Sequence, residues 1–261
     1  MDHETRLLDL PSGRLEVWLQ GSGHPVVLLP SLGRGQEDFD GIAPMLLAAG
    51  LRLIRPEPRG IGQSAPLREG STLFDMARDV IAAMEQDGVA TALVAGHAAG
   101  NWVARITAHL RPDLVQGVAM LAAVTGTTVD PEISAAIAGS FDTSLPDEVR
   151  LGHLRRGYFA PGNDASVWLP GWHTEVARAQ RRAREATTDR SWLRVADRKP
   201  LLYLAAAEDA IAAPPSEADL RATLGPLAQR VVIERAGHAL LPEQPQAVAE
   251  ALIDYARRLW P

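Results

Sequence analysis

The amino-acid sequence predicts an α/β fold with a mostly parallel central sheet and helices on both faces. Short apolar runs alternate with segments whose apolar residues recur at helical spacing, up to about residue 125 and again from about residue 198. Such alternation is typical of strand–helix–strand units that build a parallel sheet. The run Pro25–Leu29 is apolar throughout, as expected for a strand buried on both faces.

The expected elements of the first half follow one another with short connections. Two runs around the turn Pro11-Ser12-Gly13 predict an antiparallel hairpin at the sheet edge. An amphipathic helix is expected to end at about Ala49. The other predicted elements are strands at Thr5–Leu10, Arg14–Gln20, Pro25–Leu29, Leu51–Arg55, Ala90–Ala95 and Val115–Leu121, a helix at Thr72–Gln86 and a helix from Ala99.

The strand–helix alternation stops between residues 126 and 197. This segment has no strand-like run but many charged residues and several large aromatic ones. We interpret it as a mostly helical cap, residues 126–197, inserted into a core made of residues 1–125 and 198–261. The core pattern resumes with strands at Pro200–Leu204 and Val231–Glu234 and helices at Pro215–Leu224 and Pro245–Leu259.

Composition and charge exclude several function classes. The net charge of -6 leaves no basic excess to neutralise phosphates, so no nucleic-acid partner is expected. No apolar run is long enough to span a bilayer, and no secretory signal is visible, so we expect a cytoplasmic protein. The chain has no cysteine, no H-E-x-x-H motif and scattered histidines, so neither a metal nor another cofactor is expected. The sequence is compatible with a homodimer.

A tight turn between the strand at residues 90–95 and the following helix carries the most informative motif. It has the sequence Gly96-His97-Ala98-Ala99-Gly100. A strand, a sharp turn and a helix with glycine at both ends of five residues match the nucleophile elbow, G-x-S-x-G. The glycines leave room for the neighbouring strand and helix. The position of the nucleophile is occupied by Ala98, which has no side-chain oxygen.

With these elements in place, the chain resembles the α/β-hydrolase family over essentially its full length. The stretch Arg59-Gly60-Ile61-Gly62-Gln63-Ser64 matches the family's R-G-x-G-x-S turn, and the elbow follows it. Ala205-Ala206-Ala207-Glu208-Asp209 and Ala236-Gly237-His238 follow the last two strands, where the family places its acid and its histidine. The loop after the third strand has Pro30-Ser31 in place of the family's His-Gly.

The resemblance implies roles for individual residues. His238 would be the general base, and Asp209 the carboxylate that orients it, with Glu208 and Asp130 as the alternative acids. The backbone N–H groups of Leu32 and Ala99 would form an oxyanion hole. His97 is expected to have a packing role.

The expected substrate is small and largely apolar, because the predicted cap is rich in aromatic residues. His173 lies beside Trp172 and is a further candidate for substrate contact, whereas the basic run Arg178–Arg184 is interpreted as a solvated helix face. The candidate substrate-binding residues are Ser31, Phe141, Trp168, Trp172 and His173.

Alanine at the elbow leaves three hypotheses open. In the first, the chain is a serine-to-alanine variant of an ester, lactone or carbon–carbon bond hydrolase. In the second, it is a natural member of the family without a nucleophile. In the second case the His238–Asp209 pair would activate water or take a proton from the substrate. The third hypothesis is a non-catalytic protein that binds or senses a small molecule on the same fold.

Overall fold

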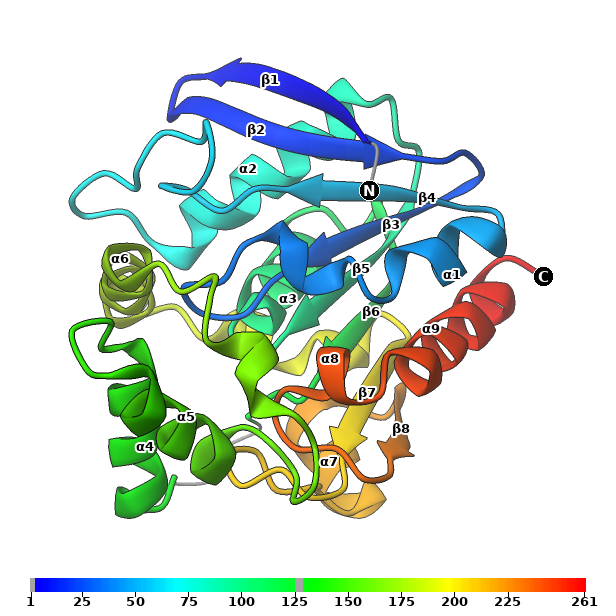
Figure 1. The fold of residues 1–261 in the computed structure, drawn as a ribbon. Coiled ribbons are helices and arrows are strands. Elements are labelled where there is room, and N and C mark those ends of the chain that lie inside the picture. The colour runs from blue at the N-terminus through cyan, green and yellow to red at the C-terminus, as the bar shows by residue number, and fades with distance from the viewer. Residues whose placement is uncertain (1–2, 125–128) are drawn as a thin grey trace.

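The computed structural model describes residues 3–124 and 129–261 and contains one eight-stranded sheet in the order β1-β2-β4-β3-β5-β6-β7-β8 (Figure 1). The pairs β1/β2 and β2/β4 are antiparallel, and the remaining neighbours run parallel, which confirms the predicted α/β-hydrolase fold with its edge hairpin. The strands are β1 (Glu4–Leu10), β2 (Gly13–Gln20), β3 (His24–Leu29), β4 (Leu51–Pro56), β5 (Ala92–His97), β6 (Val115–Leu121), β7 (Leu201–Ala206) and β8 (Ala228–Ile233).

The strands in the middle of the sheet contribute side chains to two separate hydrophobic cores. Along β3, Val27 and Leu29 face one core, whereas Val26 and Leu28 face the other. This alternation follows from the two-residue period of a strand. Helices α2 (Leu73–Gln86) and α3 (Gly100–Leu110) cover the first core, and α1 (Ala43–Ala48) and α9 (Pro245–Leu259) cover the second. Both faces of the sheet are therefore buried, as the apolar strands predict.

The segment between β3 and β4 differs from the single helix that the sequence predicts. The structure has a short 3₁₀ helix, η1 (Gln36–Phe39), followed by α1. Pro44 lies in the first turn of α1, where its lack of an N–H is harmless, but it prevents a continuous helix through this point. The remaining core helices are α7 (Glu217–Leu224) and α8 (Leu240–Glu243).

Within its described residues, the segment between β6 and β7 is helical. It contains α4 (Pro131–Phe141), α5 (Asp147–Gly157), η2 (Ala165–Trp168), α6 (Thr174–Ala186) and η3 (Ser191–Asp197). Tyr158 and Trp168 from this segment share a third hydrophobic cluster with Ile211 and Ala239 of the core. The division of the chain into a core and a cap domain stays a prediction, and its boundary at residues 125 and 126 lies outside the described residues.

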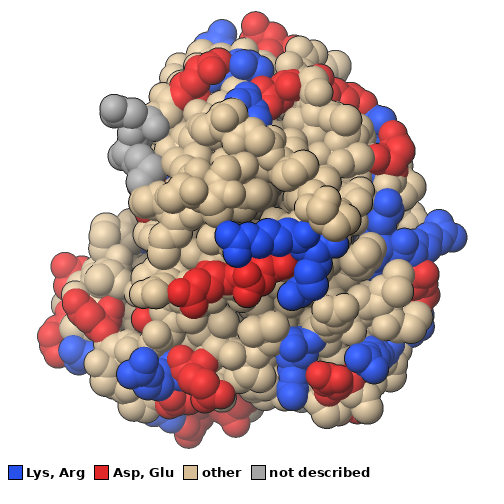
Figure 2. Space-filling view, turned by 90° about the vertical axis from the view of Figure 1, so that its right-hand side faces the viewer, with Lys and Arg blue, Asp and Glu red and all other residues tan. Residues whose placement is uncertain are grey.

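The surface and the helices give two further facts about possible partners. Figure 2 shows basic side chains lying beside acidic ones on the face turned to the viewer, with a broad uncharged area above them. Among the described helices, none combines the length and the apolar character needed to cross a membrane.

The turn between β5 and α3 is tightly packed against neighbouring backbone. A Cβ atom on Gly96 would lie 2.5 Å from Asn101 N, and one on Gly100 would lie 2.7 Å from Pro30 O. Ala98, between them, has a φ angle of 44°, in the left-handed region that alanine rarely adopts. This agrees with the strained turn expected of a nucleophile elbow.

We predict that Gly100→Ala destabilises the fold by about 3 kcal/mol, because the atoms its Cβ would meet belong to the backbone and cannot move aside. Gly152→Ala is the matched control, since this glycine lies inside α5 with open space around it. It should stabilise the protein by roughly 0.5–1 kcal/mol through helix propensity. Urea denaturation of the two variants measures both changes, and equal stability of the two would contradict the packing argument.

Candidate active site

A buried histidine–carboxylate pair lies at the carboxyl ends of the strands. His238 follows β8, Asp209 follows β7, and the imidazole Nδ1–H lies 2.9 Å and 3.1 Å from the two carboxylate oxygens of Asp209. Asp209 Oδ1 also accepts the backbone N–H groups of Ile211 and Ala212, both at 2.8 Å. The carboxylate is thereby fixed in place and can in turn fix the orientation of the imidazole.

The environment of Asp209 keeps it ionised. Burial pushes its pKa upward, but His238 and the two backbone N–H donors outweigh burial, so that the pKa of Asp209 lies below its ordinary value of 3.8. The charge on this carboxylate is therefore present throughout the neutral range. A charged acceptor on Nδ1 favours the tautomer in which Nε2 is free to take a proton.

The alternative acids lie elsewhere. Asp130 caps the N-terminus of α4, where its side chain accepts the N–H groups of Glu132 and Ile133. Glu208 is exposed, and its own N–H donates to Ala236 O. Within the described part of the chain, Asp209 is thus the one of the three candidates that contacts His238.

His97 packs directly behind the pair. Its Nε2–H donates to the carbonyl oxygen of His238 at 2.8 Å, and its ring lies 5.7 Å from the His238 ring. Burial and the neighbouring His238 lower the pKa of His97 to about 3. His97 is therefore neutral, and it supports the His238 backbone without adding a positive charge.

A cavity of about 140 Å³ contains the elbow and His238. Of the sequence-predicted residues, Ala98, Ala99, Leu32, Ser31 and Phe141 line it together with His238. Among the backbone hydrogen bonds that the described turns, loops and helix caps form, none uses the N–H of Leu32 or of Ala99. Both residues line the cavity, as the oxyanion-hole interpretation requires. The other lining residues are Asn101, Trp102, Val124, Ile137, Tyr158 and Ile211.

The remaining aromatic candidates lie outside this lining. Trp168 is buried between the rings of His97 and Phe159, and Trp172 packs against Phe141 and Tyr158. His173 is the N-cap of α6, and its N–H donates to Gly33 O at 2.9 Å. These three residues therefore support the cavity wall from behind.

Tyr158 is one of the lining residues that the sequence did not predict. Its ring meets the His238 ring edge-on at 5.7 Å, and it lies just after α5, at the C-cap. The aromatic content of the segment indicated such a contact, but the sequence does not tell which of several rings turns toward the elbow.

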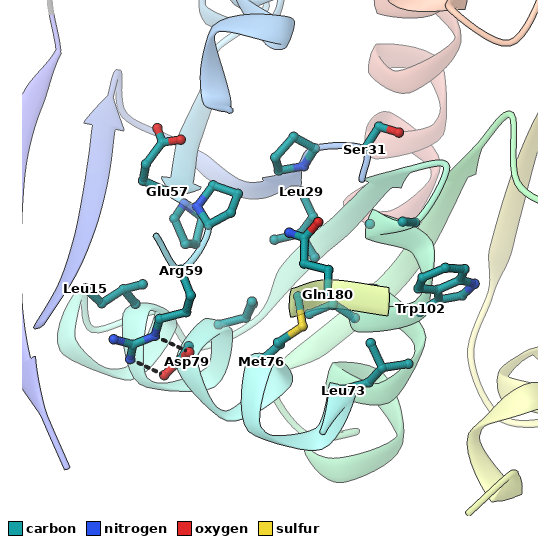
Figure 3. A pocket seen from close by; sticks show the side chains of 17 residues that line it. Leu15, Leu29, Ser31, Glu57, Arg59, Leu73, Met76, Asp79, Trp102 and Gln180 are labelled. Atoms are coloured by element: carbon teal, nitrogen blue, oxygen red, sulfur yellow. Dashed lines mark hydrogen bonds and ion pairs between the residues drawn. The ribbon is translucent and has the colours of Figure 1, made fainter. Parts of the chain in front are cut away.

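A second cavity of about 60 Å³ adjoins the first (Figure 3). The two share Ser31, Ala99 and Trp102, and the second continues between α2 and α3 over apolar side chains such as Leu73 and Met76. Figure 3 shows Arg59 and Asp79 joined at one edge, and their N–O distances are 2.6 and 2.7 Å. The positive charge of Arg59 and the negative charge of Asp79 thus pair with each other.

We found no group of metal-ligating side chains among the described residues.

The sheet order, the strained turn after β5 and the acid and histidine after the last two strands together define an α/β-hydrolase-fold protein. The family model described as "Alpha/beta hydrolase family" matches residues 26–251, and this chain belongs to that family.

Relatives in sequence include proteins of a bacteriophage, of a bacterium and of the mouse. The chain is 29% identical over 126 residues to the "Putative non-heme haloperoxidase" of Mycobacterium phage D29, covering 48% of this chain and 45% of that protein. It is 34% identical over 103 residues to the "Putative non-heme bromoperoxidase BpoC" of Mycobacterium tuberculosis, covering 39% of each. The match thus spans less than half the length of these curated relatives.

The match to solved structures covers nearly the whole chain. The crystal structure of BpoC from Mycobacterium tuberculosis H37Rv superimposes with a TM-score of 0.78 at 25% identity, covering 95% of this chain and 97% of that one. The structure of Rv0554 from the same species has a TM-score of 0.79 at 24% identity, covering 98% and 99%. At 24% identity, the likeness to Rv0554 shows a shared fold alone.

We predict that Asp209→Asn lowers the free energy of unfolding at pH 7 by about 2 kcal/mol. The amide would place an N–H₂ group against His238 Nδ1–H or leave a buried donor without its acceptor. Because the folded pKa of Asp209 is depressed, its contribution is fully present above about pH 4 and is lost as the pH falls through the folded pKa.

Asp254→Asn is the control, since Asp254 is an exposed partner of Arg257 on α9 and should change stability little. Urea denaturation at pH 7 and pH 5 measures both variants. If Asp209→Asn matched its control at both pH values, the carboxylate would not anchor His238.

Proposed function

We propose that the protein is an enzyme that acts on a small, largely apolar substrate with His238 as general base and without a nucleophilic side chain. The observation that carries the proposal is the buried His238–Asp209 pair in the same cavity as Ala98. A base and its orienting carboxylate are costly to bury, so their presence beside an empty nucleophile position favours chemistry over a passive scaffold.

The proposed mechanism uses Nε2 of His238 to take a proton, either from a water molecule that attacks the substrate or from the substrate itself. Asp209, ionised and bonded to Nδ1, stabilises the imidazolium that forms. The amides of Leu32 and Ala99 are the proposed donors to the negative oxygen that develops on a carbonyl substrate. No acyl-enzyme intermediate forms at Ala98, because a methyl group cannot attack.

The size and lining of the cavity support a small substrate. A volume of about 140 Å³ is close to the roughly 150 Å³ of an engineered protein cavity that binds benzene. Phe141, Ile137 and Ile211 give the cavity an apolar wall. The names of the sequence relatives point to haloperoxidase-like chemistry on this scaffold, and we carry over only the hydrolase class of the family. The second candidate is a protein that binds a small molecule in this cavity without turning it over.

We predict that His238→Ala lowers turnover on the order of 100-fold or more, the usual effect of removing a positioned general base. The assay screens the unaltered chain against esters, lactones and 1,3-diketones and then repeats the best reaction with the variant. His24→Ala is the control, since His24 is exposed and stacks on Trp260. A reaction unaffected by His238→Ala would exclude the general-base mechanism, and binding without any turnover would favour the second candidate.

We further predict that Ala98→Ser produces a trace of activity toward p-nitrophenyl acetate if alanine is the natural residue. The surrounding side chains would then not be shaped to hold a serine oxygen against His238. Turnover at the level of an ordinary esterase, accompanied by a burst of p-nitrophenol, would instead mean that the chain is a serine-to-alanine variant. Stopped-flow absorbance separates the two results.

A further inference from the structure

Two arginines on one face of α6 stack on aromatic rings that line the cavity. The guanidinium carbon of Arg181 lies 5.2 Å from the centre of the Phe141 ring, and that of Arg184 lies 5.0 Å from the Trp102 ring. Phe141 and Trp102 both line the cavity that contains Ala98 and His238. The three-residue spacing of the two arginines places them side by side on the helix. The arginines of this run are exposed, as expected of a solvated helix face, and two of them in addition lie over aromatic rings.

Neither arginine has a carboxylate partner among the residues that the structure describes. Arg178, one turn earlier, pairs with Glu175 at 2.5 Å, and Arg34 pairs with the buried Asp38 at 2.5 Å. Arg181 and Arg184 are exposed, and no acidic group lies within ion-pair distance of either in that part of the chain. Stacking on a ring face leaves the edge of a guanidinium, with its N–H groups, available to another acceptor.

The helix that carries the two arginines is held firmly at both ends. At its start, His173 N–H donates to Gly33 O, and in its middle Gln180 Oε1 accepts Gly33 N–H at 2.8 Å. Just beyond its end, Thr187 Oγ1 accepts Leu73 N–H at 2.9 Å. These bonds tie α6 to the loop of Leu32 and to the start of α2, so the helix backbone that carries the arginines keeps a fixed position relative to the elbow. Fixed donors lose less conformational freedom on binding than mobile ones.

Neither guanidinium group is among those that line the cavity, but the charge of Arg181 acts on Tyr158, which does line it. Burial raises the pKa of the Tyr158 phenol above its ordinary value, and the charge of Arg181 opposes that rise. Since Tyr158 lines the cavity beside His238, the guanidinium lies close enough to interact electrostatically with groups inside it. In a chain with a net charge of -6, this is a local positive field at the cavity that we propose holds the substrate.

We propose that Arg181 and Arg184 form an anion-binding rim, and that the substrate is an apolar molecule with a carboxylate at one end. The apolar part occupies the cavity near Ala98, and the carboxylate is held by the two guanidinium groups. This inference rests on the proposed function in one respect, namely that the cavity is the substrate site. Arginine suits this task because its planar fork matches the two oxygens of a carboxylate.

The test compares two probes of the same shape, 4-phenylbutyrate and 4-phenylbutan-1-ol, by isothermal titration calorimetry at pH 7.5 in 20 mM salt. The unaltered chain should bind the carboxylate about tenfold more tightly than the alcohol. The preference should shrink in 0.5 M salt, because exposed charges are screened. Arg181→Met and Arg184→Met should each reduce the preference about threefold, and the double variant should abolish it. Methionine keeps an apolar stem on the ring and removes the charge.

Arg182→Met is the matched control, since Arg182 is exposed on the same helix and its variant should keep the full preference. Equal binding of the two probes to the unaltered chain would overturn the proposal, as would a preference that survives the double variant. Failure of the carboxylate to bind at millimolar concentration would overturn it as well. These outcomes are independent of catalysis: the binding preference can persist when His238→Ala has no effect on turnover, and it can be absent when turnover depends on His238.

Discussion

The close approach of three backbone segments at the end of β5 is the constraint on which the site depends. Gly96 and Gly100 allow β5, the start of α3 and the end of β3 to touch through main-chain atoms. The residue between them is then forced to a φ angle of 44°, a conformation that costs an alanine roughly 1–2 kcal/mol. The surrounding contacts make up for this cost. The same packing places Ala98 and Ala99 at the wall of the cavity that contains His238.

The second backbone donor of the site is held by the helical segment rather than by the sheet. Both polar groups of the Gly33 backbone bond to α6, through His173 and Gln180. Gly33 has a φ of 64°, and a Cβ atom there would lie 2.7 Å from the Ala177 side chain. The loop that carries Leu32 and the helix that carries the arginines therefore pack as one unit. A change in α6 would be felt at both the proposed oxyanion hole and the cavity rim.

The sequence predicted those features that depend on local pattern and chain order. The strand succession followed from the apolar runs, and the contact between Asp209 and His238 follows from their places after adjacent parallel strands. The lining of the cavity was less predictable. Of the four cap and loop residues considered, Ser31 and Phe141 line it, whereas Trp168 and Trp172 are not among the lining residues; that any of them binds substrate stays a prediction. Which ring of an aromatic-rich segment faces a cavity depends on tertiary packing, which no spacing rule encodes.

The same limit applies to the basic face of α6, since a run of arginines has the same sequence pattern whether it faces water or stacks on rings. The effect of these positive charges on the site depends on the charges of the buried groups nearby. Asp209 is ionised, and His97 is neutral because burial and the neighbouring His238 hold its pKa near 3. With His238 unprotonated, as a base must be, the interior of the site carries one uncompensated negative charge. A carboxylate substrate would be repelled by that charge at close range. In the proposed arrangement, the guanidinium groups of Arg181 and Arg184 would offset this repulsion and hold the carboxylate away from Asp209. The proposed base and the proposed anion-binding rim are thus electrostatically compatible. The negative charge of Asp209 serves the base, and the positive charges of Arg181 and Arg184 serve the substrate carboxylate.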